Sequence, residues 1–95
     1  MDAGSVADHN SFFSLLYDAL GFPTDFGHNW NALDDSLWDP DAPFLAPEGT
    51  VLVVRNARHL WSDFIEIAGL FFECWVWAAQ KWARSSTPFH LVFII

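Results

Sequence analysis

Two short apolar runs on either side of a long helical pattern restrict the fold of this chain most strongly. Residues 50–54 and 89–95 are rich in β-branched and aromatic side chains and lack polar alternation, which is typical of strands buried on both faces. Between them, apolar residues recur at helical spacing from 63 to 83, after a short helix or turn over 57–62. Two apolar strands joined through a helix predict a parallel pair with a right-handed crossover.

Two further helices are predicted before the first of these strands. Residues 12–20 place apolar side chains at helical spacing, with Asn10 or Ser11 as the expected N-cap and Gly21 where a left-handed residue often follows a helix. Asn29 is expected to cap a second helix of two to three turns, and Pro40 ends it. Residues 1–9 are expected to form a loose lead-in.

A third strand is not evident, although a stable sheet usually has three or more. Residues 1–8 contain one β-branched residue, Val6. We therefore expect a single α/β domain over residues 1–95, with a small parallel sheet of two or three strands packed with three to four helices, its first strand missing or reduced. The lead-in or another chain would then complete the sheet, and an exposed edge at residues 91–95 would favour a homodimer.

The charge of the chain is strongly acidic and unevenly distributed. Twelve Asp and Glu residues stand against four Lys and Arg, for a formal net charge of −8. Residues 1–54 contain no Lys or Arg but nine of the twelve acids. Nucleic acids and anionic membranes are excluded as partners, because both require clustered basic residues. Unpaired acids instead attract cationic proteins.

The cysteine content and the apolar stretches indicate a cytoplasmic protein. Cys74 is the single cysteine, so an internal disulfide cannot form and a reducing compartment is expected. The first ten residues lack the basic and apolar regions of a signal peptide. The most apolar stretch, residues 64–79, contains Glu66 and Glu73 and is short for a membrane span, which favours a buried amphipathic helix.

No residue pattern indicates catalysis, a metal site or a cofactor site. The four histidines lack ligand spacing, and the acids of 34–41 lack the central glycine and closing glutamate of a calcium loop. An enzyme that uses the carboxylates of Asp25, Asp34 and Asp35 is an alternative, but no electrophile stabiliser accompanies them. We expect no enzymatic activity, no catalytic residues, no metal and no cofactor.

The segment from residue 20 to residue 41 gathers acids, amides and aromatic residues in a loop and a helix. Asn31, Asp35 and Trp38 share one helical stripe because they are spaced i, i+4 and i+7, and Asp34 lies beside them. Two interpretations remain open on these residues alone. The segment is either a solvated acidic helix face or a rigid anionic plug for a cationic cleft.

The same segment resembles the barstar family, inhibitors of small secreted bacterial ribonucleases. The resemblance is carried by residues 19–23 (ALGFP) and 26–35 (FGHNWNALDD), and the later order of loop, strand, short helix, long helix and strand also fits. It implies a three-stranded parallel sheet whose first strand precedes the first helix. It also implies that the second helix and the loop before it enter the nuclease active site, where carboxylates replace substrate phosphates.

The resemblance assigns roles to individual residues. Asp35 falls on the principal anionic anchor, Gly27 on a position of close backbone approach, and Asn29 on a helix cap that supports the loop. Other positions differ from the family pattern: Asn31 replaces a frequent Asp, Asp25 an aromatic residue, Asp34 a common Trp and Trp38 a small polar residue. Gln80 and Lys81 lie near a position where the family can offer an acid. The cognate nuclease therefore differs from the best-known one.

We expect a cytoplasmic inhibitor, or immunity protein, that binds one small basic bacterial ribonuclease or nuclease toxin domain. A barstar-like module for a basic partner that is not a nuclease is the alternative. The residues expected to bind the partner are Asp25, Gly27, His28, Asn29, Asn31, Asp34, Asp35 and Trp38.

Overall fold

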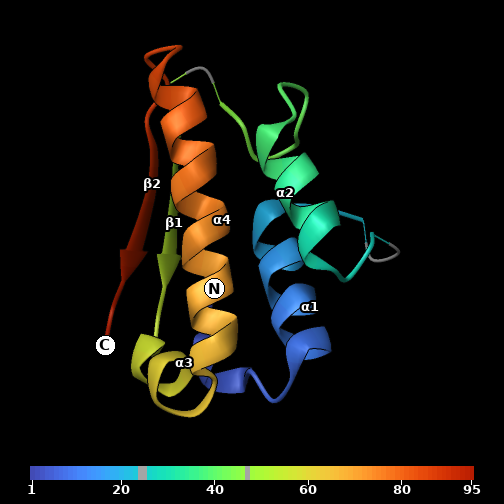
Figure 1. Cartoon of the computed structure of the whole chain (residues 1–95), viewed down its shortest axis with the longest axis vertical. Helices are drawn as coiled ribbons and strands as arrows, with labels where there is room; N and C mark the ends of the chain where they lie inside the picture. The colour runs from blue at the N-terminus through green and yellow to red at the C-terminus, as the bar shows by residue number, and fades with distance from the viewer. Residues whose placement is uncertain (24–25, 47) are drawn as a thin grey trace.

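The fold places one long helix between a two-stranded sheet and two other helices. The computed structural model describes residues 1–23, 26–46 and 48–95. In chain order the elements are η1 (Ala3–Ser5), α1 (His9–Leu20), α2 (Trp30–Trp38), β1 (Thr50–Val54), α3 (Ala57–Asp63), α4 (Ile65–Ala83) and β2 (Phe89–Phe93). Figure 1 shows the strands side by side, α4 next to them, and α1 and α2 beyond α4; α4 contacts both β2 and α2.

The sheet is parallel, as the two apolar runs predict. β1 pairs with β2 in a register that runs from Thr50 opposite Phe89 to Val54 opposite Phe93. The crossover between them consists of α3 and α4. The prediction of an α/β fold with a small parallel sheet and three to four helices is therefore confirmed.

The first strand is reduced to a short stub beside the end of β1. The amino group of Met1 donates to the Val53 carbonyl at 2.9 Å. The amide of Arg55 then donates to the Met1 carbonyl, and the amide of Ala3 to the Arg55 carbonyl, both at 2.8 Å. A single parallel bridge joins Asp2 to Arg55.

Residues 1–8 are packed against the domain, so the expectation of a loose lead-in needs correction. The side chains of Ala3 and Val6 are buried in the core. The Nε2 of His59 lies 2.8 Å from the Val6 carbonyl. Backbone pairing with β1 and burial of two small apolar side chains together offset the loss of chain entropy.

Asp2 gives the stub a dependence on pH. Its carboxylate accepts from Asn56 Nδ2 at 2.7 Å and from the Gly4 amide at 2.9 Å, and these bonds lower its pKa from 3.8. A carboxyl group whose pKa is lower in the folded than in the unfolded chain stabilises the fold at pH values above its unfolded pKa. This contribution is lost as the pH falls through the folded pKa. We expect the stability difference between the wild type and Asp2→Asn to shrink as the pH falls from neutral to below 3.8. Urea unfolding across this range measures it; a constant difference would contradict the assignment.

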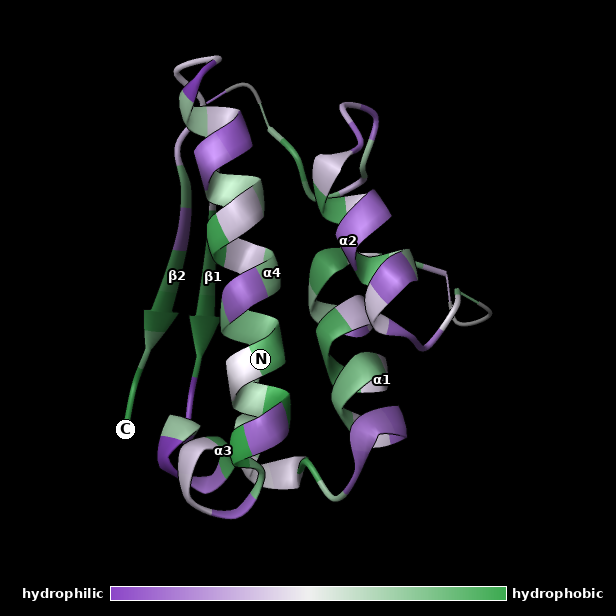
Figure 2. Ribbon diagram, viewed as in Figure 1, coloured by the Kyte–Doolittle hydropathy of each residue, from purple (hydrophilic) through white to green (hydrophobic). Residues whose placement is uncertain are grey.

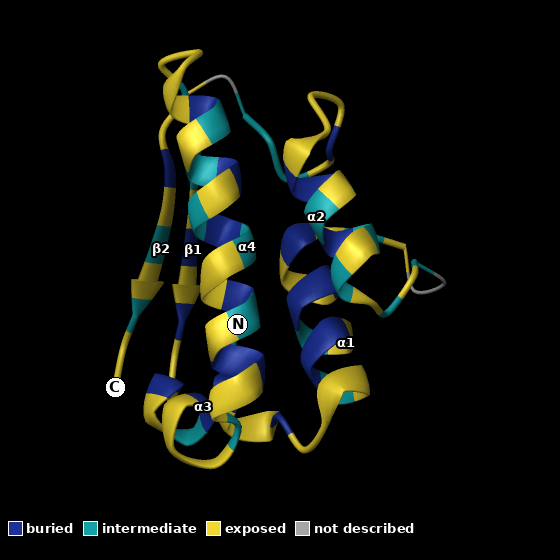
Figure 3. Ribbon diagram, in the orientation of Figure 1, coloured by how far each residue is buried: buried dark blue, intermediate teal, exposed yellow. Residues whose placement is uncertain are grey.

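The strands are covered on one face only, which corrects the expectation of strands buried on both faces. Leu52 and Val54 are buried, whereas Val51 is 60% and Val53 38% exposed. In β2, Val92 is exposed on the same side. Helix α4 lies next to the strands, and α1 and α2 lie beyond it (Figure 3). Strand composition alone cannot reveal that a second covering layer is missing.

Capping residues define the ends of α1. The cap is Asp8, not Asn10 or Ser11: its carboxylate accepts from the Ser11 amide at 2.7 Å, and Ser11 Oγ accepts from the Asp8 amide at 3.0 Å. Ser11 is thus the third residue of a capping box and not the cap itself. Gly21 closes the helix in the left-handed conformation with φ 80°, as predicted.

Apolar helix faces meet in one aromatic-rich core. Phe12 of α1 packs edge-on against Phe71 of α4 with ring centroids 5.2 Å apart, and Trp75 stacks on Phe89 of β2 at 4.3 Å. Figure 2 shows hydrophobic residues along the strands and on parts of each long helix, with polar residues between them. Among the described residues, none of the helices combines the length and apolar character that crossing a membrane requires.

Candidate functional site

The N-terminal end of α2 is fixed by a cap and by an aromatic contact. Asn29 Oδ1 accepts from the Ala32 amide at 2.8 Å, which satisfies one of the free amides of the first turn. The cap predicted at Asn29 is therefore observed. The ring of Trp30 packs against Phe13 and Phe12, with centroids 4.8 and 5.7 Å apart. The first turn of α2 is thereby attached to α1.

The C-terminal end of α2 is held by two side chains of α4. Trp82 Nε1 donates to the Leu37 carbonyl at 2.8 Å in a buried hydrogen bond. Lys81 Nζ donates to the Trp38 carbonyl and lies over the Trp38 and Trp82 rings. These donors satisfy carbonyls that have no partner within the helix, and the lysine charge complements the helix dipole. Helix α2 is consequently fixed at both ends.

Replacing Trp82 with phenylalanine should destabilise the domain through this attachment. The substitution leaves the Leu37 carbonyl buried without a donor, which costs about 1–3 kcal/mol. The matched control is Trp75→Phe, because Trp75 Nε1 is buried with no partner within the described part of the chain. Chemical denaturation should show a larger loss for Trp82→Phe; equal losses would mean that the hydrogen bond to α2 contributes nothing.

The loop before α2 is shaped by Gly27. Its carbonyl accepts from the Tyr17 hydroxyl at 2.6 Å. A Cβ added at Gly27 would lie 3.2 Å from both Ala32 Cβ and Asn29 Nδ2, so a side chain would press on the cap itself. Burial raises the pKa of Tyr17 to about 12, which keeps the hydroxyl protonated as a donor at neutral pH. Gly27 is exposed, and its backbone is open to close approach.

His28 packs against α1. Its Nδ1 lies 2.5 Å from Asn10 Oδ1, and its ring packs near Phe13 and Tyr17 with centroids 6.1 and 5.6 Å apart. The side chain is half-buried. In this structure His28 fastens the loop to α1, while its partner-binding role stays a prediction.

The outward face of α2 carries acidic groups without counter-charges. Asn31, Asp35 and Trp38 are exposed, and Asp34 is half-buried toward α4. Among the described residues, the one ion pair joins His59 to Asp63. The carboxylates of Asp34 and Asp35 therefore present uncompensated negative charge on a fixed helix.

The structure places most of the expected binding residues in one continuous surface. Gly27 and Asn29 lie at the N-terminal end of α2, and the polar stripe of Asn31 and Asp35 follows from them along the helix. Of the eight expected residues, Asp25 is the one that lies outside the described part of the chain.

A groove between α2 and α4 adds residues that the sequence reasoning missed. Its volume is about 240 Å³. The residues that line it are Trp30, Asn31, Asp34, Leu70, Glu73, Cys74 and Trp77. On the last helix, the family resemblance pointed only to the neighbourhood of Gln80 and Lys81, and Lys81 donates to the Trp38 carbonyl of α2. The available signal was the spacing of Glu73 and Trp77, which are four residues and so about one turn apart on the long helix.

Cys74, in the wall of this groove, is a weakly reactive thiol. Burial, together with the nearby charges of Asp34 and Glu73, raises its pKa to about 11. The thiol is therefore protonated at neutral pH, and a nucleophilic role is disfavoured. In the described ranges, His, Cys, Asp and Glu do not form a group of three that could hold a metal.

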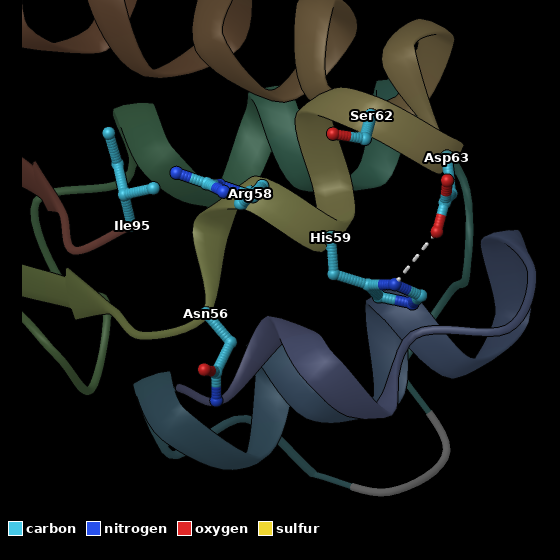
Figure 4. Close-up of a pocket in the computed structure, with 6 residues that line it drawn as sticks. All are labelled: Asn56, Arg58, His59, Ser62, Asp63 and Ile95. Carbon is cyan, nitrogen blue, oxygen red and sulfur yellow. Dashed lines mark ion pairs between the residues drawn. The ribbon is translucent and has the colours of Figure 1, made fainter.

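A second hollow, of about 620 Å³, lies beside α3 and, unlike the acidic face of α2, is lined by both basic and acidic side chains (Figure 4). His59 Nδ1 lies 3.2 Å from Asp63 Oδ2, and Arg58 points away from this pair toward Ile95. Charges of both signs are spread around an open rim. Because His59 also contacts the Val6 carbonyl, we interpret this region as the attachment of the N-terminal stub.

Comparison with known proteins identifies one family. A family model described as Barstar (barnase inhibitor) matches residues 1–94. Comparisons with curated proteins and with solved structures give no match.

Proposed function

Because this chain belongs to the barstar family, whose members are ribonuclease inhibitors, we propose that it inhibits a small basic bacterial ribonuclease or nuclease toxin domain as its immunity protein. The observation that supports this most is that α2 is fixed at both ends and presents acids without ion-pair partners, among the described residues, on its outward face. A rigid anionic helix can enter a cationic cleft without losing much conformational entropy on binding.

The inhibitor would act by one-to-one occlusion of the active site. Asp35 would occupy a position where substrate phosphate binds, opposite Arg, Lys or His of the enzyme. Asn31, Asp34 and Trp38 would contact the surrounding surface, and the exposed backbone of Gly27 would approach the enzyme closely. Asn29 and His28 would hold the loop in shape. Asp25 is proposed as a contact from the resemblance and the sequence alone.

The experiment that tests this function is inhibition together with partner capture. The immobilised protein should capture a small basic nuclease from its native host, and the purified protein should inhibit that nuclease at equimolar concentration. Capture of a basic protein without nuclease activity would favour the alternative, a barstar-like binding module. Turnover of a phosphoester by the chain alone would contradict the inhibitor role. Cell fractionation tests the proposed cytoplasmic location, which the single cysteine supports.

We also propose a homodimer through the outer edge of β2. The Thr50 amide donates to Pro88 and the Ile94 amide to Val54, so the alternate residues Leu91 and Phe93 direct their backbone groups away from β1. Leu91→Pro removes one outward amide without breaking a bond inside the sheet. Sedimentation equilibrium should show a dimer for the wild type and a monomer for this variant; a wild type that is monomeric at all concentrations would contradict the dimer.

A further inference from the structure

We propose that α4 supplies a second layer of the homodimer interface, so that helix packs on helix above the paired edges of β2. This inference rests on the proposed homodimer and is independent of the ribonuclease. It assigns interface roles to residues of α4 that neither the strand patterns nor the family resemblance indicated, and it fixes the register in which the two copies of β2 pair.

Helix α4 carries a second apolar stripe beside the one that forms the core. Its members follow heptad spacing, with alternating steps of four and three residues: Ile65, Gly69, Phe72, Val76, Ala79 and Ala83. All are absent from the buried residues of the helix, and none carries a polar or charged side chain. Ile65 is 60% and Phe72 48% exposed, and a Cβ added at Gly69 would have open space around it. An exposed apolar stripe of this length is typical of a helix that packs against a partner.

The stripe lies along the outer edge of β2. Phe72 and Phe93 line one hollow, of about 450 Å³, and Ala79 and Phe89 line another, of about 340 Å³. Phe89 and Phe93 are the two ends of the strand, so the stripe accompanies β2 over its whole length. Figure 1 shows β2 at one side of the molecule with α4 next to the strands. The helix layer and the strand layer are therefore open on the same side.

The edge of β2 can pair with itself about a two-fold axis. Leu91 and Phe93 direct their backbone groups away from β1, and in an antiparallel ladder two such residues exchange both of their hydrogen bonds. If Leu91 pairs with Phe93 of the second copy, Val92 of each copy lies at a two-fold axis perpendicular to the sheet. The helices of both copies then lie on the same side of one continuous sheet.

The helix stripe is centred on the same axis. Phe72 lies beside Phe93, and one strand residue of about 3.3 Å corresponds to about two helical residues of about 1.5 Å, so Cys74 is level with Val92. The stripe is symmetric about position 74, and two antiparallel copies of α4 therefore oppose all six of its members. The opposed pairs are Phe72 with Val76, Gly69 with Ala79, and Ile65 with Ala83. A second copy satisfies strand and helix at once, whereas an unrelated strand or helix would cover one layer only.

The first test removes the helix contact and leaves the strand edge intact. Gly69→Lys places a long charged side chain where Ala79 of the second copy would lie, and overpacking of this kind should raise the Kd of the dimer at least about tenfold. Gln80→Lys is the matched control, because it adds the same charge at an exposed position of α4 outside the stripe. Sedimentation equilibrium measures both variants, and thermal unfolding confirms that they fold. An unchanged dimer in Gly69→Lys, or equal weakening by both variants, would overturn the proposal.

The second test determines the register by cross-linking in a Cys74→Ala background. Val92 and His90 are both exposed. In the proposed register Val92 faces its own counterpart, and the Cβ atoms of directly opposite residues are about 4.5–5.5 Å apart, which a small shift brings within disulfide range. His90 would face Ile94 and lie about 13 Å from its counterpart. Diamide should therefore convert Val92→Cys into a covalent dimer much faster than His90→Cys; the reverse order, or no cross-link at Val92→Cys, would show that the register is wrong.

The ribonuclease inhibitor role and this interface can fail separately. Helices α1 and α2 lie beyond α4 from the strands (Figure 1), so the dimer leaves the α2 face free. The monomeric Gly69→Lys variant should therefore inhibit the captured ribonuclease as well as the wild type does. Full inhibition by a wild type that neither dimerises nor cross-links would reject the interface and keep the inhibitor role. Specific cross-linking at Val92→Cys in a chain that captures no ribonuclease would support the interface and reject the inhibitor role.

Discussion

Replacing Asp35 with alanine should weaken binding to the ribonuclease more than any other single substitution on α2. The side chain is exposed at the centre of the polar stripe and has no ion-pair partner among the described residues. On binding, its carboxylate would be desolvated against cationic groups of the enzyme, and removing it would leave those groups unpaired. The expected size is taken from the barnase–barstar complex, in which close charge pairs couple by about 1.5–7 kcal/mol.

The control for this prediction is Asp18→Ala. It removes the same charge from an exposed position of α1, so it tests whether net charge alone explains the effect. Titration calorimetry, or competition where binding is too tight, measures both variants. Equal affinity of Asp35→Ala and the wild type would place the interface elsewhere on the molecule.

Association with the ribonuclease should slow strongly as salt is added. Residues 1–54 contain nine acidic residues and no Lys or Arg. The α2 side of the molecule should therefore attract a cationic partner over a distance. Such steering raises association rates by about 10–10³-fold at low ionic strength, and salt screens it. Dissociation should change much less, because contacts formed in the complex are excluded from solvent.

Stopped-flow association across a range of salt concentrations measures this effect. Asp39→Asn, which removes an acid just beyond α2, should show a shallower dependence on salt than the wild type. An association rate that is independent of salt would argue against electrostatic steering and against a strongly basic partner.

Signals within a few residues predicted much of the fold. The cap at Asn29 and the left-handed Gly21 each depend on contacts within one turn of a helix, so their residue types suffice to locate them. The parallel pairing of β1 and β2 was predictable for a different reason, because two apolar strands joined through a helix almost always form a parallel pair. At the start of α1 the local signal led to the wrong N-cap. Ser11 is a residue type that often caps helices, but here Asp8 is the N-cap and Ser11 is the third helical residue of the capping box.

The candidate site could be predicted in part. The motif from Gly27 to Trp38 lies in one segment, and helical spacing already puts Asn31, Asp35 and Trp38 on one stripe. The groove could not be predicted in this way, because Trp77 lies far along the chain from Trp30. Only the packing of α4 against α2 brings them together.

By itself, the sequence determined the class of fold, the acidic character of the proposed binding surface and the segment that is proposed to carry it. Each of these depends on composition or on spacing within one element. Only the tertiary structure decided that Met1 completes the sheet edge beside Val53, that one face of the strands stays open, and that Lys81 is engaged at the end of α2. These features depend on groups that lie more than forty residues apart or on which layer covers which face. Their free energy comes from long-range burial and pairing, for which the local pattern carries no signal.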